Sequence, residues 1–322
     1  MLLVAAARKC RRLSREVLCY EQPRAPPQKD RGGSTKHVRI LDGALPPDMF
    51  AMMQSAFAPS APFWREHAYH DPATGYFSYV HALGGGAPRS GLDQVIRHIH
   101  ALVCRKQPQA KQACFAEWWA HCRPHSSGHQ LHFDSDNEGQ GTVRNPILSS
   151  VIYLHEDESV GGPTLMTNQR LGARLADRGW LVFPRANRLV SFDGAVLHGV
   201  VPGRSGGGGN AAGGAAGARR VTFMVAFWRA IRTRPSPDGR PGPSQPFPYK
   251  AAAAAAGRTW QRPLLPVREG WGEDAAAAAA AAAPRVVLPF PLRRVWEAVG
   301  EEMTPVEALS GPPHYNLCFQ GF

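Results

Sequence analysis

Two histidines and one aspartate give the sequence its clearest candidate for chemistry. His132 and Asp134 belong to a His-x-Asp triplet within the stretch GHQLHFDSD. In an extended strand, successive side chains point to opposite faces, so His132 and Asp134 would share one face while Leu131 and Phe133 share the other. Two metal-binding side chains would then enter the same interior space, and the apolar pair would anchor the strand from behind.

A second triplet, formed by His155, Glu156 and Asp157, lies in a different context. It follows the apolar run SSVIYL and continues into acidic, glycine-rich sequence, which is typical of a solvated turn. We therefore interpret His155 and Asp157 as turn residues and not as ligands.

A third ligand must come from elsewhere, and His198 is the best candidate. It lies in RLVSFDGAVLHGVVPG, where the neighbouring residues Leu197 and Val200 are apolar. A histidine in such a setting is more often an ordinary core residue. The order of features along the chain nevertheless favours a ligand: His-x-Asp, an apolar strand, a Gly-Gly-Pro turn, further apolar strands, the histidine, and then arginine.

Two neutral imidazoles and one carboxylate on one side of a metal leave three adjacent coordination positions open. This arrangement is typical of non-haem ferrous iron in oxygenases, which needs room for a co-substrate and for O₂. Zinc can use the same ligand types but favours a closed site or a single bound water. We predict that His132, Asp134 and His198 are catalytic metal ligands.

The elements that must position these residues are mostly short strands. The expected strands cover residues 113–122, 130–134, 147–154, 164–167, 180–183, 189–192, 196–201 and 221–228. They follow a strand that begins at His37 and two helices, at 46–57 and 91–106. Without βαβ alternation or a G-x-G-x-x-G after a strand, the pattern argues against a Rossmann fold. We predict a mainly β (α+β) fold, a jelly-roll-like double sheet with N-terminal supporting helices.

The composition divides the chain into three parts. Residues 1–36 hold nine Lys and Arg against three Asp and Glu, which is half of the net charge of +12, and are expected to form a basic disordered arm or a targeting segment. Residues 37–232 are the predicted catalytic domain, with the Gly/Ala run at 205–218 as a loop insertion. Residues 233–322 are a Pro/Ala-rich low-complexity segment in which 286–299 could form a short helix.

Taken together, several segments resemble the 2-oxoglutarate- and Fe(II)-dependent dioxygenases, and within them the prolyl hydroxylase-like branch. The matching segments are LHFD at 131–134, SSVIYLHED at 149–157, GGPTL at 161–165, RLVSFDGAVLHGVVPG at 188–203 and RRVTFMVAFW at 219–228. The resemblance implies a double-stranded β-helix, Fe(II), and a hydroxylase that uses O₂ to couple decarboxylation of 2-oxoglutarate to C–H oxidation. Ascorbate is left open as a further requirement.

The same resemblance implies a basic residue on the last strand that binds the distal carboxylate of 2-oxoglutarate. Arg220 is the first choice, because it opens the run VTFMVAFW, and a guanidinium group binds a carboxylate through two parallel hydrogen bonds. Arg219, which would point to the opposite face, stays open as the alternative, since the interval after His198 is longer than is usual in the family. Tyr153 matches a family position where a phenol can bond the co-substrate, or it is an ordinary strand aromatic.

Two other classes of protein remain open at this point. One is a cupin-like metal-dependent enzyme that does not use 2-oxoglutarate, and the other is a basic non-enzymatic binding protein, although nucleic acid is not the expected partner. No run approaches the roughly 18 apolar residues of a membrane span. The six cysteines include no C-x-x-C pair, so we expect an intracellular protein, cytoplasmic by default. We also expect a monomer whose substrate is a peptidyl residue or a small molecule.

Overall fold

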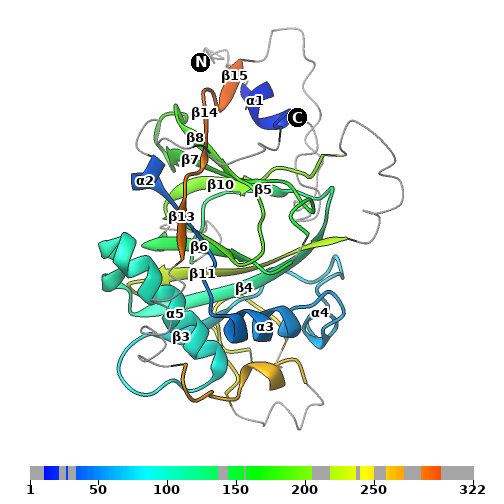
Figure 1. Cartoon of the computed structure of the whole chain (residues 1–322), viewed down its shortest axis with the longest axis vertical. Coiled ribbons are helices and arrows are strands. Elements are labelled where there is room, and N and C mark those ends of the chain that lie inside the picture. The colour runs from blue at the N-terminus through cyan, green and yellow to red at the C-terminus, as the bar shows by residue number, and fades with distance from the viewer. Residues whose placement is uncertain are drawn as a thin grey trace, which may run out of the picture.

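Two sheets, antiparallel except for the parallel pair β12–β3, face each other and account for most of the ordered chain (Figure 1). The computed structural model describes residues 11–21, 27, 34–136, 144–155, 157–204, 218–236, 240–249, 259–271 and 284–298. The larger sheet has the strand order β12-β3-β4-β11-β6-β9-β2-β13, and the smaller one has the order β14-β8-β7-β10-β5. The mainly β, double-sheet prediction is confirmed.

The strands of the larger sheet are β12 (Gln245–Pro246), β3 (Tyr79–Ala82), β4 (Phe115–Pro124), β11 (Arg219–Trp228), β6 (Leu148–Tyr153), β9 (Arg188–Asp193), β2 (Val38–Asp42) and β13 (Arg285–Val287). The strands of the smaller sheet are β14 (Phe290–Leu292), β8 (Gly179–Val182), β7 (Thr164–Arg170), β10 (Val196–Val200) and β5 (His129–His132). The eight strands expected between 113 and 228 are all present, with ends that move by up to three residues.

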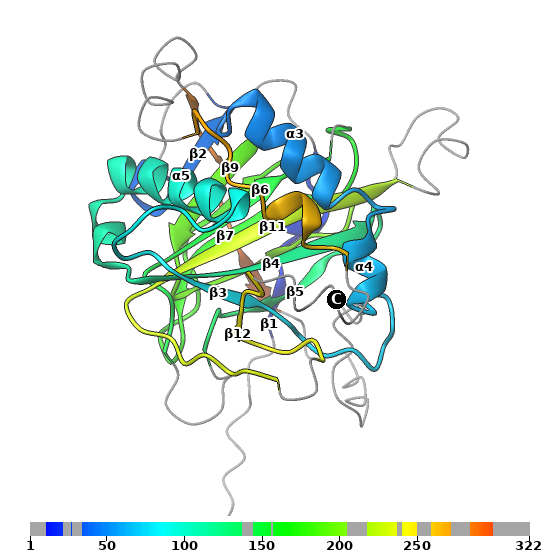
Figure 2. The same ribbon diagram turned by 90° about the horizontal axis from the view of Figure 1, so that it is seen from below.

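Helices cover the outer face of the larger sheet (Figure 2). The helices are α3 (Pro47–Ala56), α4 (Pro62–Glu66) and α5 (Gly91–Lys106), besides the short α1 (Arg15–Leu18) and α2 (Ser34–His37) and the 3₁₀ turns Pro108–Gln112 and Arg262–Leu264. Helix α5 starts where Ser90 accepts a hydrogen bond from the backbone of Asp93, and its apolar side packs on the sheet. No helix in the described part of the chain is long and apolar enough to cross a membrane.

Strand alternation divides the apolar residues of the larger sheet between two cores. Trp118, Phe223 and Phe227 face outward and pack with the helices in one cluster. The alternate position Met224 faces inward, where it packs with residues of the smaller sheet such as Trp180. The inward face therefore forms one wall of an inter-sheet space, and the residues on it are the ones that can meet the metal-ligand candidates.

The N-terminal residues 11–21 differ from the expected disordered arm. Arg11–Leu13 forms strand β1, and helix α1 follows it. Leu13 and Val17 are fully buried in a third apolar cluster on the outer side of the smaller sheet. The expectation was wrong here because it relied on the charge of the segment and overlooked two apolar side chains, which pack on the smaller sheet. The remainder of the arm lies outside the described residues, apart from residue 27 and 34–36 in α2.

The C-terminal residues 284–298 form strands and not the expected helix. Strands β13 and β14 pair with β2 and β8, and β15 (Trp296–Ala298) pairs with β1. Pro289 and Pro291 explain the difference, because proline in a helix interior removes a hydrogen bond and clashes with the preceding turn. Both flanks of residues 37–232 thus add strands that pack on its sheets. The Gly/Ala run lies almost wholly outside the described residues.

Candidate metal centre and inter-sheet site

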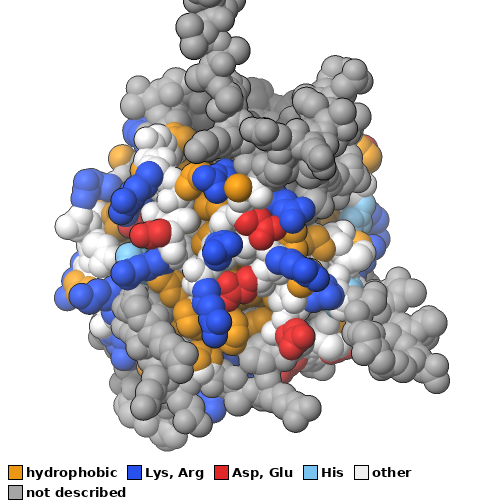
Figure 3. All heavy atoms as spheres, turned by 90° about the horizontal axis from the view of Figure 1, so that it is seen from above, with side chains coloured by type: hydrophobic (Ala, Val, Ile, Leu, Met, Phe, Trp, Pro, Cys, Tyr) orange, Lys and Arg blue, Asp and Glu red, His pale blue; other side chains and the backbone are white. Residues whose placement is uncertain are grey.

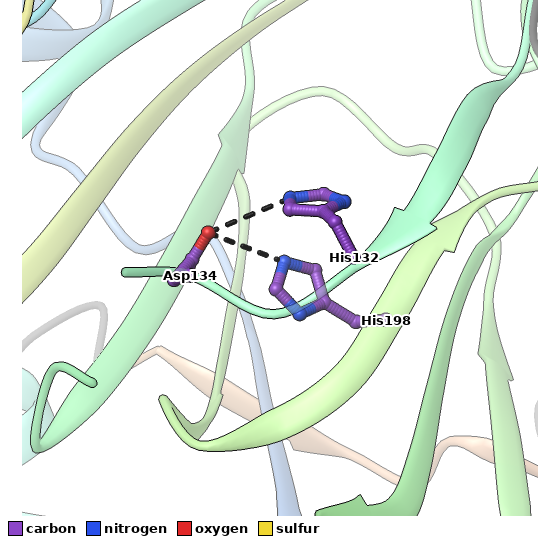
Figure 4. Close-up of side chains that lie close together, drawn as sticks. All are labelled: His132, Asp134 and His198. Atoms are coloured by element: carbon purple, nitrogen blue, oxygen red, sulfur yellow. Dashed lines mark ion pairs between the residues drawn. The ribbon is translucent and has the colours of Figure 1, made fainter. Parts of the chain in front are cut away.

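Three side chains converge in the space between the sheets (Figure 4). His132 ends β5 and lies opposite His198 of β10 in the strand register, while Asp134 follows two residues after β5. Asp134 Oδ1 lies 3.5 Å from His132 Nε2 and 3.6 Å from His198 Nε2. One ligand atom from each residue lies within 4.8 Å of the others, so the predicted triad is brought together in a geometry that could hold a metal ion.

Backbone hydrogen bonds hold both imidazoles in a ligand-ready orientation. His132 Nδ1 lies 2.9 Å from the carbonyl oxygen of Gln130, and His198 Nδ1 lies 3.0 Å from that of Val196. A carbonyl only accepts, so each Nδ1 carries a proton, and Nε2 of the neutral imidazole keeps its lone pair. Both Nε2 atoms face the carboxylate, which is the donor set that a divalent transition metal binds.

Asp134 is fixed from both sides by residues that sequence reasoning missed. Ser149 Oγ donates to Asp134 Oδ2 at 2.5 Å, and Asn145 Nδ2 donates to the Asp134 carbonyl oxygen at 2.6 Å. Oδ1 is left to face the two imidazoles. Ser149 could have been suspected, because it alternates with Val151 and Tyr153 on the inner face of β6.

The electrostatics of the cluster depend on burial and on the carboxylate: burial would lower the pKa of His132, but the hydrogen bond and the charge of Asp134 raise it. Burial alone would raise the pKa of Asp134, but His198, His132 and the Ser149 hydrogen bond lower it to about 2. Burial lowers the pKa of His198 to about 4, against the opposing effect of Asp134. At neutral pH the cluster therefore offers an ionised carboxylate and a neutral imidazole.

Arg220 lies on the inner face of β11, is 3% exposed, and forms no ion pair with an acidic side chain among the described residues. Its Nη2 donates to Thr164 Oγ1 at 2.9 Å, and the Tyr153 hydroxyl lies 2.7 Å from the same oxygen. The Arg220 guanidinium carbon lies 5.1 Å from the centre of the Tyr153 ring. A Cβ at Gly161, which adopts a φ of +82°, would collide with the Arg220 side chain. The Gly-Gly-Pro turn therefore makes room for this arginine.

Several buried polar atoms around Arg220 have no hydrogen-bond partner among the described residues. They are Arg220 Nε, Thr222 Oγ1 and His121 Nε2, and His121 lies directly opposite Thr222 in the strand register. Tyr69 accepts a hydrogen bond from the Cys122 backbone and lies 3.0 Å from His121 Nδ1; when the phenol donates to Nδ1, the imidazole proton lies on Nε2. Unsatisfied buried donors are costly, and a ligand rich in oxygen acceptors would satisfy them.

The structure separates the remaining candidates. Arg219 is half-buried and donates weakly to the Cys122 carbonyl at 3.4 Å on the other side of the strand, so of these two candidates Arg220 is the one on the inner face, where it is opposite buried Arg123 of β4. His155 is not in a solvated turn as expected: its Nδ1 lies 3.2 Å from the Val221 carbonyl oxygen, and burial lowers its pKa to about 4. Asp157 is exposed and bonds Ser159 in a turn. Neither belongs to the metal-ligand cluster, and Glu156 lies outside the described residues.

Comparisons with known proteins find no match to a family model and none to a curated protein. Among solved structures, the fold is similar to a prolyl-4-hydroxylase of Pseudomonas putida, with 18% identity over 64% of this chain and 98% of that one and a TM-score of 0.37. It is also similar to a viral collagen prolyl hydroxylase from Paramecium bursaria Chlorella virus-1, solved as a 2OG complex (13%, 59% and 94%, TM-score 0.34). A third is HygX of Streptomyces hygroscopicus, solved with iron bound (11%, 65% and 91%, TM-score 0.32). Likenesses this distant do not assign a function, which has to come from the site itself.

Proposed function

We propose that the protein is an Fe(II)- and 2-oxoglutarate-dependent dioxygenase that hydroxylates a peptidyl residue or a small molecule. The observation that carries this proposal is the pairing of two features in one inter-sheet space. Three metal-ligand side chains converge there, and a buried arginine with no described acidic partner lies among unsatisfied donors on the same β11 face. A metal ion and a carboxylate-bearing ligand are the two groups whose chemistry fits these residues.

His132, Asp134 and His198 would hold the iron, with their Nε2 atoms and Oδ1 as ligands. Bound Fe(II) would supply the redox chemistry by which O₂ oxidises 2-oxoglutarate to succinate and CO₂ and inserts one oxygen into a substrate C–H bond. Ser149 keeps Asp134 Oδ2 occupied, so that Oδ1 is presented to the metal. The backbone bonds of the two histidines keep their protons away from it.

Arg220 would bind the distal carboxylate of 2-oxoglutarate through charge-assisted hydrogen bonds. Thr164, already bonded to Arg220 and Tyr153, orients the guanidinium group. Thr222 and His121 offer further hydrogen-bond donors on the same face. The apolar residues of the inter-sheet core exclude water from this end, which strengthens each of these interactions.

The two alternatives fit the site less well. A cupin-like enzyme without 2-oxoglutarate leaves the buried Arg220 and its unsatisfied neighbours unexplained. A basic binding protein would be supported by a continuous positive surface, whereas Lys and Arg side chains on the face drawn in Figure 3 are interspersed with Asp and Glu. The proposal includes a monomer that acts inside the cell and a catalytic domain centred on residues 37–232.

The test is turnover of 2-oxoglutarate by the purified full-length chain. With Fe(II), O₂ and ascorbate, wild type should form succinate, and His132→Ala and His198→Ala should abolish this and weaken metal binding. His155→Ala is the matched control, since this histidine lies outside the cluster, and should retain turnover. Metal binding without any succinate would favour the cupin-like alternative.

A further inference from the structure

Glu117 lies in β4 on the sheet face that looks toward the metal-ligand cluster. It is opposite Ala226 of β11, which is opposite Ser149 of β6. Directly opposed residues share a face, and Ser149 donates to Asp134, so all three belong to the inner face. Neighbouring strands are about 4.8 Å apart, so Glu117 and Ser149 lie roughly 10 Å from each other, with the small side chain of Ala226 between them.

This row lies toward the far end of β11 from the proposed co-substrate site. Arg220 is near the start of the strand, whereas Ala226 and Trp228 are at its end. A cavity of about 270 Å³ opens at that end, lined by Arg144, Asn145, Ile147, Trp228, Arg229 and Ala230. Asn145 also donates to the Asp134 carbonyl oxygen, so one residue of the cavity wall contacts a metal-ligand candidate.

Two serine hydroxyls hold one oxygen of the Glu117 carboxyl, and no described residue bonds the other. Its Oε1 accepts hydrogen bonds from Ser78 at 2.5 Å and from Ser244 at 2.9 Å. Within the described residues, Oε2 makes no hydrogen bond, and no Lys, Arg or His forms an ion pair with this carboxyl, although it is only 3% exposed. Burial raises its pKa to about 7, the two serines oppose this, Asp134 adds to it, and Arg234 lowers it.

A purely structural role does not account for this arrangement. A glutamine could accept both serine hydroxyls through its amide oxygen without the cost of a buried charge. A carboxylate becomes favourable there when a cationic N–H donor occupies the free oxygen. We propose that Glu117 is a substrate-recognition residue, whose Oε2 binds a protonated amine or a guanidinium group of the substrate. That the bound cation is a substrate rests on the proposed oxygenase function, whereas the cation-binding site itself does not.

The segment that carries Ser244 forms the neighbouring wall. Ser244 has a φ of +53° and its backbone donates to Ser78 Oγ at 2.7 Å, while Arg234 from the same part of the chain donates to the Asp136 carbonyl oxygen. Arg234 and Ser244 therefore connect this part of the chain to Asp136 and to Glu117. Ser244 thus borders the proposed site, although its composition had placed it in a low-complexity segment.

The test uses two small probes on the zinc-loaded full chain. n-Butylguanidinium carries charge and N–H groups, whereas n-butyltrimethylammonium carries the same charge without an N–H. Glu117→Gln is the informative variant, because its amide oxygen can keep the serines while its NH₂ replaces the acceptor Oε2. By calorimetry, the guanidinium probe should bind wild type at least about tenfold more tightly than Glu117→Gln. The trimethylammonium probe should show a much smaller difference.

A second variant separates recognition from loop anchoring. Ser244→Ala removes one hydroxyl from Glu117 but keeps the carboxylate, so it should retain the tenfold preference. If Ser244→Ala loses the preference as fully as Glu117→Gln, or if the guanidinium probe binds wild type and Glu117→Gln equally or not at all, the proposal is overturned. Failure of wild type to turn over 2-oxoglutarate would defeat the oxygenase function, while the probe result would still decide the cation site.

Discussion

At the scale of single residues, the candidate metal site is prepared by short-range hydrogen bonds. His132 and His198 each use the carbonyl two residues earlier in their own strand, so the extended backbone places a proton on each Nδ1. Asp134 lies beyond the end of β5 and depends on Ser149 from the opposite sheet. The His-x-Asp spacing could therefore predict the histidine orientation, whereas the serine contact needed the fold.

Ser149→Ala should weaken metal binding by roughly 10–100-fold, because residues that orient a ligand carry effects of this size. Without the Ser149 hydroxyl, Asp134 Oδ2 loses its partner and the carboxylate can rotate. Ser150→Ala is the matched control: its hydroxyl bonds the Val225 carbonyl at 2.8 Å, and its side chain points to the opposite face. Fe(II) or Zn(II) titration should separate the two variants, and equal affinities would contradict this role of Ser149.

Glu117 should give the protein a measurable pH dependence of stability. Its pKa is about 7 in the fold against an ordinary value of 4.5, so between these values the folded state keeps a proton that the unfolded state loses. Stability then falls as pH rises through this window, by up to about 1.4 kcal/mol per pH unit, and levels off above it. Between pH 5 and pH 7.5, the free energy of unfolding of Glu117→Gln, measured with urea, should rise by on the order of 2–3 kcal/mol relative to that of wild type. A pH-independent difference would contradict the shift.

At the scale of elements, the sequence predicted long strands better than short ones. Strands β4, β6 and β11 have six to ten residues with clear boundaries, and sequence located each of them. Strands β1, β13, β14 and β15 have three residues each and exist through their partners, so they carry little local signal. His121 was missed for a related reason, since its Tyr69 contact joins residues 52 positions apart.

The N-terminal elements should matter for stability, contrary to the expectation of a dispensable arm. Leu13 is fully buried beside Leu165 and Leu181, so Leu13→Ala should lower the free energy of unfolding by about 2–5 kcal/mol. Arg12→Ala is the control: Glu297 forms a surface ion pair with Arg12 at 2.7 Å, which solvent screens, so the loss of stability should be much smaller. Denaturant unfolding of both variants measures this, and equal losses would mean that β1 packs less firmly than described.

At the scale of the whole molecule, each of the two sheets supplies different functional residues to the space between them. The smaller sheet and the residues just after it supply the three metal-ligand candidates. The larger sheet supplies Arg220 near one end of its inner face and Glu117 toward the other. The sequence predicted the metal-ligand candidates and, through the resemblance, Arg220. Glu117 was found only when strand register placed it in the same row as Ser149.

The central claim is that this space binds 2-oxoglutarate through Arg220, and calorimetry with the manganese-loaded chain under anaerobic conditions tests it most directly. A hydrogen bond to a charged group is worth about 1.5–3 kcal/mol, so Arg220→Ala should weaken 2-oxoglutarate binding at least about tenfold. Arg220→Lys should recover part of this, because an ammonium cannot form the planar pair. Arg219→Ala, which changes the neighbouring outward side chain, should bind nearly as wild type does. Equal 2-oxoglutarate affinities in wild type and Arg220→Ala would contradict the account.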